Sequence, residues 1–323
     1  MRKITRAFLC AILSLCLLLS ICGCSLADGV PGVEVQVTFI TDSMEKSVSV
    51  PYGEVVSPLR GPKKENHIFT GWYTNETRKQ EYDFSTPVTR DIELYAGFVL
   101  DGAALTNEIT IGVMPALVTV ENEYTAASGK IMVAQGSGFI YKIENGRAYV
   151  LTNCHVAYAD SGMQSFIVKD FQGGEHTAAI YRKSLLSAPA ISADYDLAVL
   201  TFSYSENDLK TIPFAKAEAR DGDGVISLGS PGNQSHAITF GKMLDFIPVE
   251  LPESDPKESN VKFEIIYHSA SIMNGSSGGP LLNGDLELIG VNFAGTPPEE
   301  GENFGSGCAV PLAKVQEFLS LYE

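Results

Sequence analysis

The feature that most limits the fold of this 323-residue chain is the shortness of its apolar runs from Glu108 onward. These runs are separated by Gly, Asn, Asp and Pro, and four of them lie at 148–152, 196–201, 224–228 and 286–291. Short apolar runs between turn residues are typical of strands. Residues 311–322 differ, because their apolar side chains recur three and four positions apart, as on one face of a helix. We therefore predict an all-β barrel or sandwich domain that ends in one amphipathic helix.

The segment before this domain predicts a second, smaller β-rich module. Residues 33–39 alternate apolar and polar side chains, and similar stretches lie at 48–56 and 92–98. Such alternation is the period of a half-buried strand. We place the module at 33–99 and a linker to the larger domain at 100–107.

Two aromatic motifs give the small module a resemblance to a known family. They read F-T-G-W-Y at 69–73 and Y-D-F-S-T-P-V-T at 82–89, followed by D-I-E-L-Y-A. The module resembles a Listeria–Bacteroides (internalin B-type) repeat, which implies a small, β-grasp-like spacer or adhesive unit on surface-exposed bacterial proteins, with a surface ligand of its own. A domain this small needs large aromatic side chains to bury enough area. We therefore interpret the following four aromatics as core residues rather than as a ligand platform: Trp72, Tyr73, Phe84 and Tyr95.

The N-terminus has the pattern of an export signal. Three basic residues within the first six precede fifteen uncharged, mostly apolar residues from Ala7 to Ile21. This run is short for a membrane span and suits a secretory signal. The following C-G-C-S at 22–25 resembles a bacterial lipobox, which implies cleavage after Gly23 and lipid on Cys24. We predict a signal peptide at 1–23, a linker at 24–32 and a protein held by lipid on the outer face of the bacterial cell membrane; an ordinary cleavage site is the alternative.

Composition excludes several classes of protein. The chain is 45% hydrophobic and 19% charged, which is globular rather than disordered. Its net charge of −16 disfavours nucleic-acid binding. Four of six cysteines lie at or before position 24, so the exported fold keeps only Cys154 and Cys308 and is not a disulfide scaffold. We interpret both as small buried hydrophobes, and whether they pair stays open.

Three segments of the larger domain carry chemistry. The sequence N-G-S-S-G-G-P at 274–280 places serine in a glycine-rich turn, where an unobstructed backbone can direct N–H groups toward a substrate. A histidine ends the strand-like segment L-T-N-C-H-V at 151–156, and aspartates open D-Y-D-L-A-V at 194–199. Together they supply a nucleophile, a general base and an orienting carboxylate.

These segments belong to a longer series that resembles trypsin-like serine peptidases, in particular the bacterial HtrA/Deg type. The blocks occur in this order: G-S-G-F-I at 136–140, L-T-N-C-H-V at 151–156, D-L-A-V at 196–199, G-D-G-V-I-S-L-G-S-P at 222–231, G-S-S-G-G-P at 275–280, L-I-G-V-N at 288–292 and G-S-G-C-A-V-P at 305–311. The resemblance implies a double β-barrel protease domain, here 108–323, that needs no cofactor and cleaves proteins or peptides. It makes Ser277 the nucleophile, His155 the base and Asp196 the residue that orients it, with the backbone N–H groups of Gly275 and Ser277 as oxyanion hole. Since the sequence ends a dozen residues after Pro311, we expect no PDZ domain.

Some assignments have alternatives. Ser276 is adjacent to Ser277 and is the alternative nucleophile, although it stands where the family has Asn or Asp. Asp194 lies two residues before Asp196 and is the alternative orienting carboxylate. The remaining histidines lack the T-N-x-H-V setting, so we interpret them as surface or structural residues: His67, His176, His236 and His268.

Matching pocket positions of the family predict an uncharged pocket for small or medium apolar side chains. They are Ser271, Ile272, Phe293, Ala294, Ser306 and Cys308. We expect an exported serine endopeptidase of unknown oligomeric state. A catalytically silent surface-binding or adhesion protein is the alternative function.

Overall fold

The computed structural model describes residues 32–126, 128–159, 164–206, 208–230, 237–249, 255–296 and 305–322. The predicted signal peptide, Cys24 and His236 lie outside these residues. The chain divides into two compact units, one made of Thr70–Gly97 with the described residues up to Pro62, the other of Lys63–Phe69 with the described residues from Phe98 onward. None of the helices within the described ranges is both long and apolar enough to cross a membrane.

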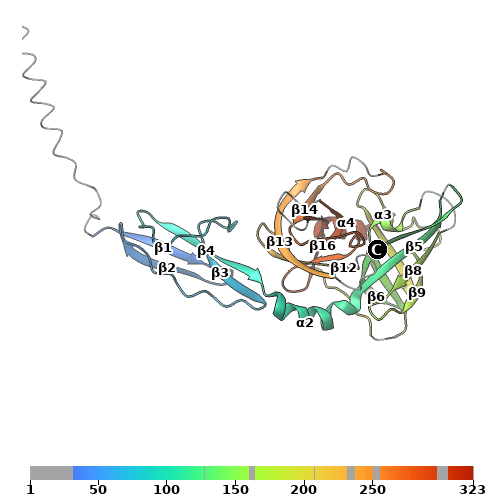
Figure 1. The fold of residues 1–323 in the computed structure, drawn as a ribbon, viewed down its shortest axis with the longest axis horizontal. Coiled ribbons are helices and arrows are strands. Elements are labelled where there is room, and N and C mark those ends of the chain that lie inside the picture. The colour runs from blue at the N-terminus through green and yellow to red at the C-terminus, as the bar shows by residue number, and fades with distance from the viewer. Residues whose placement is uncertain are drawn as a thin grey trace, which may run out of the picture. The chain divides into compact units, whose positions relative to one another are not determined.

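The first unit is built around a four-stranded sheet in the order β2-β1-β4-β3 (Figure 1). Its strands are β1 (Glu34–Ile40), β2 (Glu45–Pro51), β3 (His67–Tyr73) and β4 (Ile92–Leu100). The alternation read from the sequence appears in the burial pattern of β1, whose Val35, Val37 and Phe39 point inward. Strand β1 runs antiparallel to β2 and parallel to β4. The prediction of a small β-rich module is confirmed.

The aromatic side chains of this unit divide between core and surface. Trp72 is 2% exposed, meets the Phe39 ring edge-on at 4.8 Å, and donates its indole N–H to the Leu59 carbonyl at 3.1 Å. Tyr73, Phe84 and Tyr95 are only partly buried. Trp72 is thus the central core aromatic, and the other three sit at the edge of the core.

The second unit contains two β-barrels. The first is a sheet in the order β10-β11-β7-β6-β5-β8-β9 that an additional β11–β9 pairing closes. Its strands are β5 (Leu117–Thr125), β6 (Ile131–Glu144), β7 (Arg147–Thr152), β8 (Gln164–Lys169), β9 (Glu175–Ile180), β10 (Ile191–Ser192) and β11 (Leu197–Ser203).

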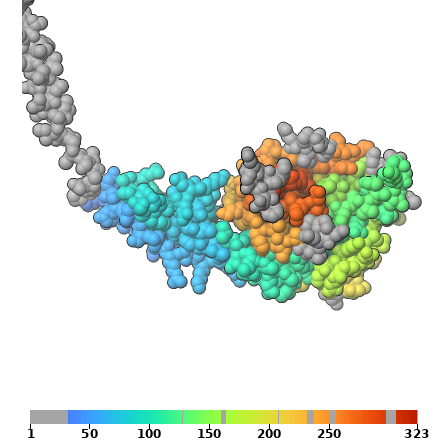
Figure 2. All heavy atoms as spheres, viewed as in Figure 1, coloured from blue at the N-terminus to red at the C-terminus, as the bar shows by residue number. Residues whose placement is uncertain are grey.

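The second barrel closes in the order β12-β13-β14-β17-β16-β15. Its strands are β12 (Gly224–Gly229), β13 (Ala237–Pro248), β14 (Glu264–His268), β15 (Pro280–Leu282), β16 (Leu288–Gly295) and β17 (Gly307–Pro311). Figure 2 shows the surface of the first barrel in green and yellow and that of the second in orange and red. The prediction of a mainly β, double-barrel fold is confirmed.

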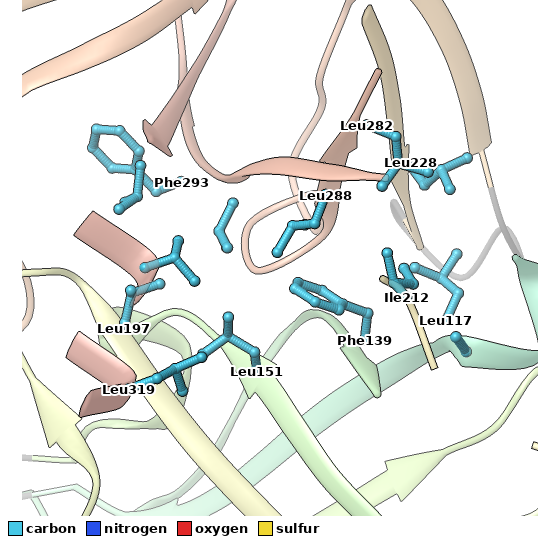
Figure 3. Packing of buried hydrophobic residues seen from close by; sticks show 14 of the residues in the cluster. Leu117, Phe139, Leu151, Leu197, Ile212, Leu228, Leu282, Leu288, Phe293 and Leu319 are labelled. Carbon is cyan, nitrogen blue, oxygen red and sulfur yellow. The ribbon is translucent and has the colours of Figure 1, made fainter. Parts of the chain in front are cut away.

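One apolar cluster crosses from barrel to barrel. Phe139 and Leu151 of the first barrel lie in the same cluster as Leu228 and Leu288 of the second (Figure 3). All four side chains are fully buried. The two barrels are therefore held together by the burial of apolar side chains that both contribute.

Two longer helices complete this unit. Helix α4 (Leu312–Ser320) is the predicted C-terminal helix and buries its apolar face, including Val315 and Phe318. Helix α2 (Gly102–Gly112) occupies most of the segment 100–107, where the sequence predicted a linker. The Asp101 carboxylate caps it by accepting from the N–H groups of residues 103 and 104, and Leu105 and Ile109 join the apolar cluster. This segment is thus part of the barrel packing rather than an exposed connection.

Candidate active site

The first barrel places His155 and Asp196 at the same end of two neighbouring strands. His155 lies in the short helix α3 (Cys154–Ala157), directly after β7, and Asp196 directly precedes β11. These strands are antiparallel, with Thr152 opposite Ala198, so the end of one lies beside the start of the other. The Asn153 amide fixes the approach by donating to the Asp196 carbonyl at 2.8 Å.

The two side chains are joined by a bidentate contact. His155 Nδ1 lies 2.9 Å from Asp196 Oδ2 and 3.1 Å from Oδ1, and the His155 backbone N–H donates to Oδ1 at 3.0 Å. Asp196 is fully buried and adopts a left-handed backbone with φ of +48°. A carboxylate only accepts, so Nδ1 carries the proton and Nε2 of the neutral ring is left as an acceptor.

Opposing effects set the pKa of His155. Burial lowers it, but the charge of Asp196, its hydrogen bond to the ring and the charge of Glu258 together raise the pKa above its ordinary value. The environment thus favours the imidazolium that a proton-accepting step would form.

The second barrel contributes the loop between β14 and β15, which holds Ser276 and Ser277. Gly275 and Gly278 adopt φ values of +94° and +85°, which suit glycine because it has no Cβ. Ser276 is 5% exposed, and its hydroxyl accepts from the Met273 N–H at 3.2 Å, while its own N–H donates to the Met273 carbonyl at 2.8 Å. Ser276 therefore shapes the turn, whereas Ser277 is half-buried.

Ser137 of β6 connects the two halves of the site. Its backbone N–H donates to the Ser277 carbonyl at 2.7 Å, and its hydroxyl donates to the Gly275 carbonyl at 2.6 Å. Its own carbonyl accepts from the Thr152 hydroxyl at 2.7 Å, three residues before His155. Space here is minimal, since a Cβ on Gly278 would lie 2.1 Å from the Ser137 oxygen. Ser137 was not among the predicted site residues; its G-S-G-F motif was the only sequence signal.

The Ser277 hydroxyl donates to the Phe293 carbonyl at 3.4 Å, which is long for a hydrogen bond. Within the described residues no hydrogen bond joins it to His155. The backbone N–H groups of Gly275 and Ser277 likewise have no acceptor in this part of the chain. Both N–H groups are thus available to an incoming oxygen atom.

The six predicted pocket residues come together only in part. Ala294 and Cys308 are paired across β16 and β17. The Ile272 side chain packs against Gly295, whose Cβ, if it had one, would lie 3.1 Å from Ile272. Phe293 and Cys308, however, are 4% and 6% exposed and belong to the apolar core. The remaining partly exposed positions are Ser271, Ile272, Ala294 and Ser306.

The alternative residues occupy other surroundings. Asp194 accepts from the Asn260 amide at 2.7 Å and is not joined to His155. His176 contacts Asp170 at 2.9 Å, and His67 contacts the Glu65 carbonyl at 2.6 Å.

The two cysteines are both buried and free. Burial raises the pKa of Cys308 to about 11 and that of Cys154 further, which keeps both as thiols. No set of three or more His, Cys, Asp or Glu residues in the described ranges is arranged to hold a metal ion.

Comparison with known families agrees with this arrangement. Residues 136–291 match the trypsin-like peptidase domain, and residues 36–97 match the Listeria–Bacteroides repeat domain. This chain contains a trypsin-like peptidase domain. The resemblance of the larger domain to trypsin-like peptidases and that of the small module to the Listeria–Bacteroides repeat are confirmed.

Relatives of the peptidase domain include two HtrA-type proteins. The chain is 33% identical over 184 residues to "Serine protease Do-like HtrA" of Bacillus subtilis, covering 56% of this chain and 37% of the relative. It is 36% identical over 183 residues to "Probable periplasmic serine endoprotease DegP-like" of Rickettsia conorii, covering 55% and 32%. The chain thus spans about a third of the length of these relatives.

The double barrel also occurs among solved structures. The crystal structure of the Rv3671c protease from M. tuberculosis, in its active form, superposes with a TM-score of 0.53 at 22% sequence identity. The match covers 69% of this chain and 88% of that protein. At this identity the likeness concerns the fold of the peptidase domain.

Proposed function

We propose that this chain is an exported serine endopeptidase that cleaves peptide bonds with Ser277, His155 and Asp196. The observation that carries the proposal is the hydrogen-bonded pair of His155 and the fully buried Asp196. It lies in the same peptidase domain as a glycine-bounded serine loop, in which the N–H groups of Gly275 and Ser277 have no acceptor among the described residues. A nucleophile, a base, an orienting acid and oxyanion donors are the parts that acyl transfer requires.

The first half of the reaction forms an acyl-enzyme. The Ser277 hydroxyl attacks the substrate carbonyl carbon while His155 Nε2 takes its proton. The carbonyl oxygen becomes negative and accepts hydrogen bonds from the N–H groups of Gly275 and Ser277. His155 then gives its proton to the amine nitrogen, the C–N bond breaks, and the first product leaves.

The second half uses water in the same way. Water gives a proton to His155 and attacks the acyl carbon, and the proton returns to Ser277 as the acid product leaves. The buried Asp196 carboxylate stabilises the imidazolium in both halves. The long 3.4 Å contact of the Ser277 hydroxyl with Phe293 offers little resistance to the rotation that brings it toward His155.

The finer points of the proposal concern specificity and location. The partly exposed positions Ser271, Ile272, Ala294 and Ser306 carry no charge, which supports cleavage after small or medium apolar residues. The predicted signal peptide and the lipid on Cys24 would place the enzyme on the outer face of the cell membrane, and the repeat would bind a surface partner. Efficient cleavage after Arg or Lys in a peptide-library profile would contradict the proposed pocket.

A catalytically silent binding protein is the second candidate. One observation favours it: within the described residues the Ser277 hydroxyl is bonded to Phe293 and not to His155. The two candidates differ in whether Ser277 reacts.

Labelling with a fluorophosphonate, which reacts with activated serines, separates them. We expect the wild-type ectodomain to be labelled on Ser277, and Ser277→Ala to fold normally without label. Ser184→Ala is the control, since it removes an exposed hydroxyl outside the serine loop, which bonds to the Ser187 hydroxyl at 2.9 Å, and it should retain labelling. A folded wild-type protein that takes no label, and cleaves no peptide in a library, would support the binding protein instead.

A further inference from the structure

A cluster of polar side chains lies inside the second barrel, behind the serine loop. His268 of β14 and Asn292 of β16 are fully buried, and Ser227 of β12 is 3% exposed. Burying such groups is costly unless they are hydrogen-bonded. None of the three takes part in the reaction described above, so their presence in an otherwise apolar barrel needs another explanation.

The hydrogen bonds of this cluster have a fixed direction. The Asn292 Nδ2 group lies 3.0 Å from the Ser227 hydroxyl and 3.3 Å from the Pro280 carbonyl. A carbonyl only accepts, so the NH₂ group faces Pro280, and the amide oxygen faces His268 Nε2 at 3.1 Å. Nε2 must therefore carry the proton and donate it.

The surroundings of His268 keep its side chain neutral. Burial lowers the pKa of His268 to about 4. The hydrogen bonds of the ring with the Asn292 side chain and the Ala270 backbone act to raise the pKa, but burial outweighs them. The ring packs closely against the Gly307 backbone of the adjacent β17, where a Cβ would lie 2.2 Å from its Cε1 atom.

The backbone of Asn292 makes two hydrogen bonds with the serine loop, one to Gly278 and one to Gly279. Its carbonyl accepts from the Gly278 N–H at 2.8 Å, and its N–H donates to the Gly279 carbonyl at 2.9 Å. These glycines directly follow Ser277. The next residue on the strand, Phe293, accepts from the Ser277 hydroxyl. A displacement of Asn292 would therefore move the backbone that carries the nucleophile.

We propose that His268 is a positioning residue for the nucleophile: its N–H fixes the Asn292 side chain, and Asn292 in turn fixes the loop from Ser277 to Gly279. This assignment rests on the proposed function, because it takes Ser277 as the reacting serine. It adds a determinant on β14 that lies outside the trypsin-like sequence blocks.

The effect should show as a loss of rate rather than of substrate affinity. His268→Leu removes the donor and leaves the Asn292 oxygen unpaired, so we expect fluorophosphonate labelling and kcat on a fluorogenic peptide to fall by about tenfold to a hundredfold. KM should change by less than about threefold, since the pocket positions are not altered. His268→Gln retains an amide donor near the Nε2 position and should restore both rates to within about threefold of wild type.

Thr201→Val is the matched control. The Thr201 hydroxyl is buried in the first barrel and donates to the Ala148 carbonyl at 3.0 Å. Its loss removes one buried hydrogen bond and should lower stability without changing the labelling rate. Thermal unfolding of every variant separates stability from rate.

Each outcome decides the assignment. Wild-type labelling together with an equal rate in folded His268→Leu would overturn the role of His268 and leave the proposed function intact. Absence of labelling in the wild type would overturn the proposed function itself. If His268→Leu does not fold, His268→Gln alone decides, and a folded Gln variant that is labelled more than about tenfold slower would overturn the assignment.

Discussion

The two barrels contribute different kinds of group to the candidate site. The first barrel uses side chains, since His155 and Asp196 meet through a bidentate contact at 2.9 and 3.1 Å. The second uses backbone, since Gly275 and Gly278 shape a loop whose N–H groups are unbound in the described region. One half is therefore sensitive to charge and the other to shape, and substitutions can test each separately.

The largest effect is expected on the charged half. Asp196→Asn keeps the volume but can hold the wrong imidazole tautomer, so we expect kcat to fall by about 10⁴-fold. Asp196 also raises the pKa of His155, so activity rises with pH through a midpoint above the ordinary histidine value, and this midpoint should move to lower pH in the variant. Measurement of kcat/KM against pH tests both points.

Asp194→Asn is the matched control for this substitution. Asp194 contacts Asn260 rather than His155, so its loss should change kcat by less than about twofold. Equal losses in the two variants would contradict the assignment of Asp196.

The shape-dependent half is tested by adding one methyl group. Gly278→Ala places a Cβ 2.1 Å from the Ser137 oxygen and 2.4 Å from the Thr152 hydroxyl, so the loop must shift and labelling of Ser277 should fall by at least about a hundredfold. Gly173→Ala is matched in backbone, with φ of +87° against +85°, but has open space around it. It should cost only about 1 kcal/mol of stability and leave labelling unchanged. Similar labelling in both variants would show that the tight contact at Gly278 has no role.

The smallest effect is expected on stability in acid, and it comes from His268 in the second barrel. The pKa of His268 falls from 6.5 to about 4 on burial, so the unfolded chain binds a proton that the folded chain does not between these pH values. Stability should therefore fall by roughly 3 kcal/mol as pH drops through this window, beyond the effect of other groups. His268→Gln should flatten this part of the curve. Urea unfolding of both proteins at several pH values provides the measurement, and identical slopes would contradict it.

The sequence predicted those parts of the molecule whose pattern is local. The strands and helix α4 follow from alternation and from three-and-four spacing, and the positions of His155 and Ser277 follow from motifs. Helix α2 was not predictable in this way, because its stability comes from burying Leu105 and Ile109 against distant strands.

The supporting residues of the site lacked local signals. Ser137 gains its role from contacts with Gly275 and Ser277, some 140 residues away. His268 was interpreted as a surface or structural residue, and only the fold shows that it is fully buried and bonded to Asn292. Such roles depend on which strands become neighbours, which no short stretch of sequence records.

The bonds of Ser137 have a mechanical consequence. They couple the nucleophile loop of one barrel to the strand that leads to the base on the other, so a slide of one barrel against the other would break them without the loss of any strand. Heating or low concentrations of denaturant should therefore silence the enzyme while its strands are still intact. Activity would then report whether the barrels are aligned, and circular dichroism would report whether their strands are intact.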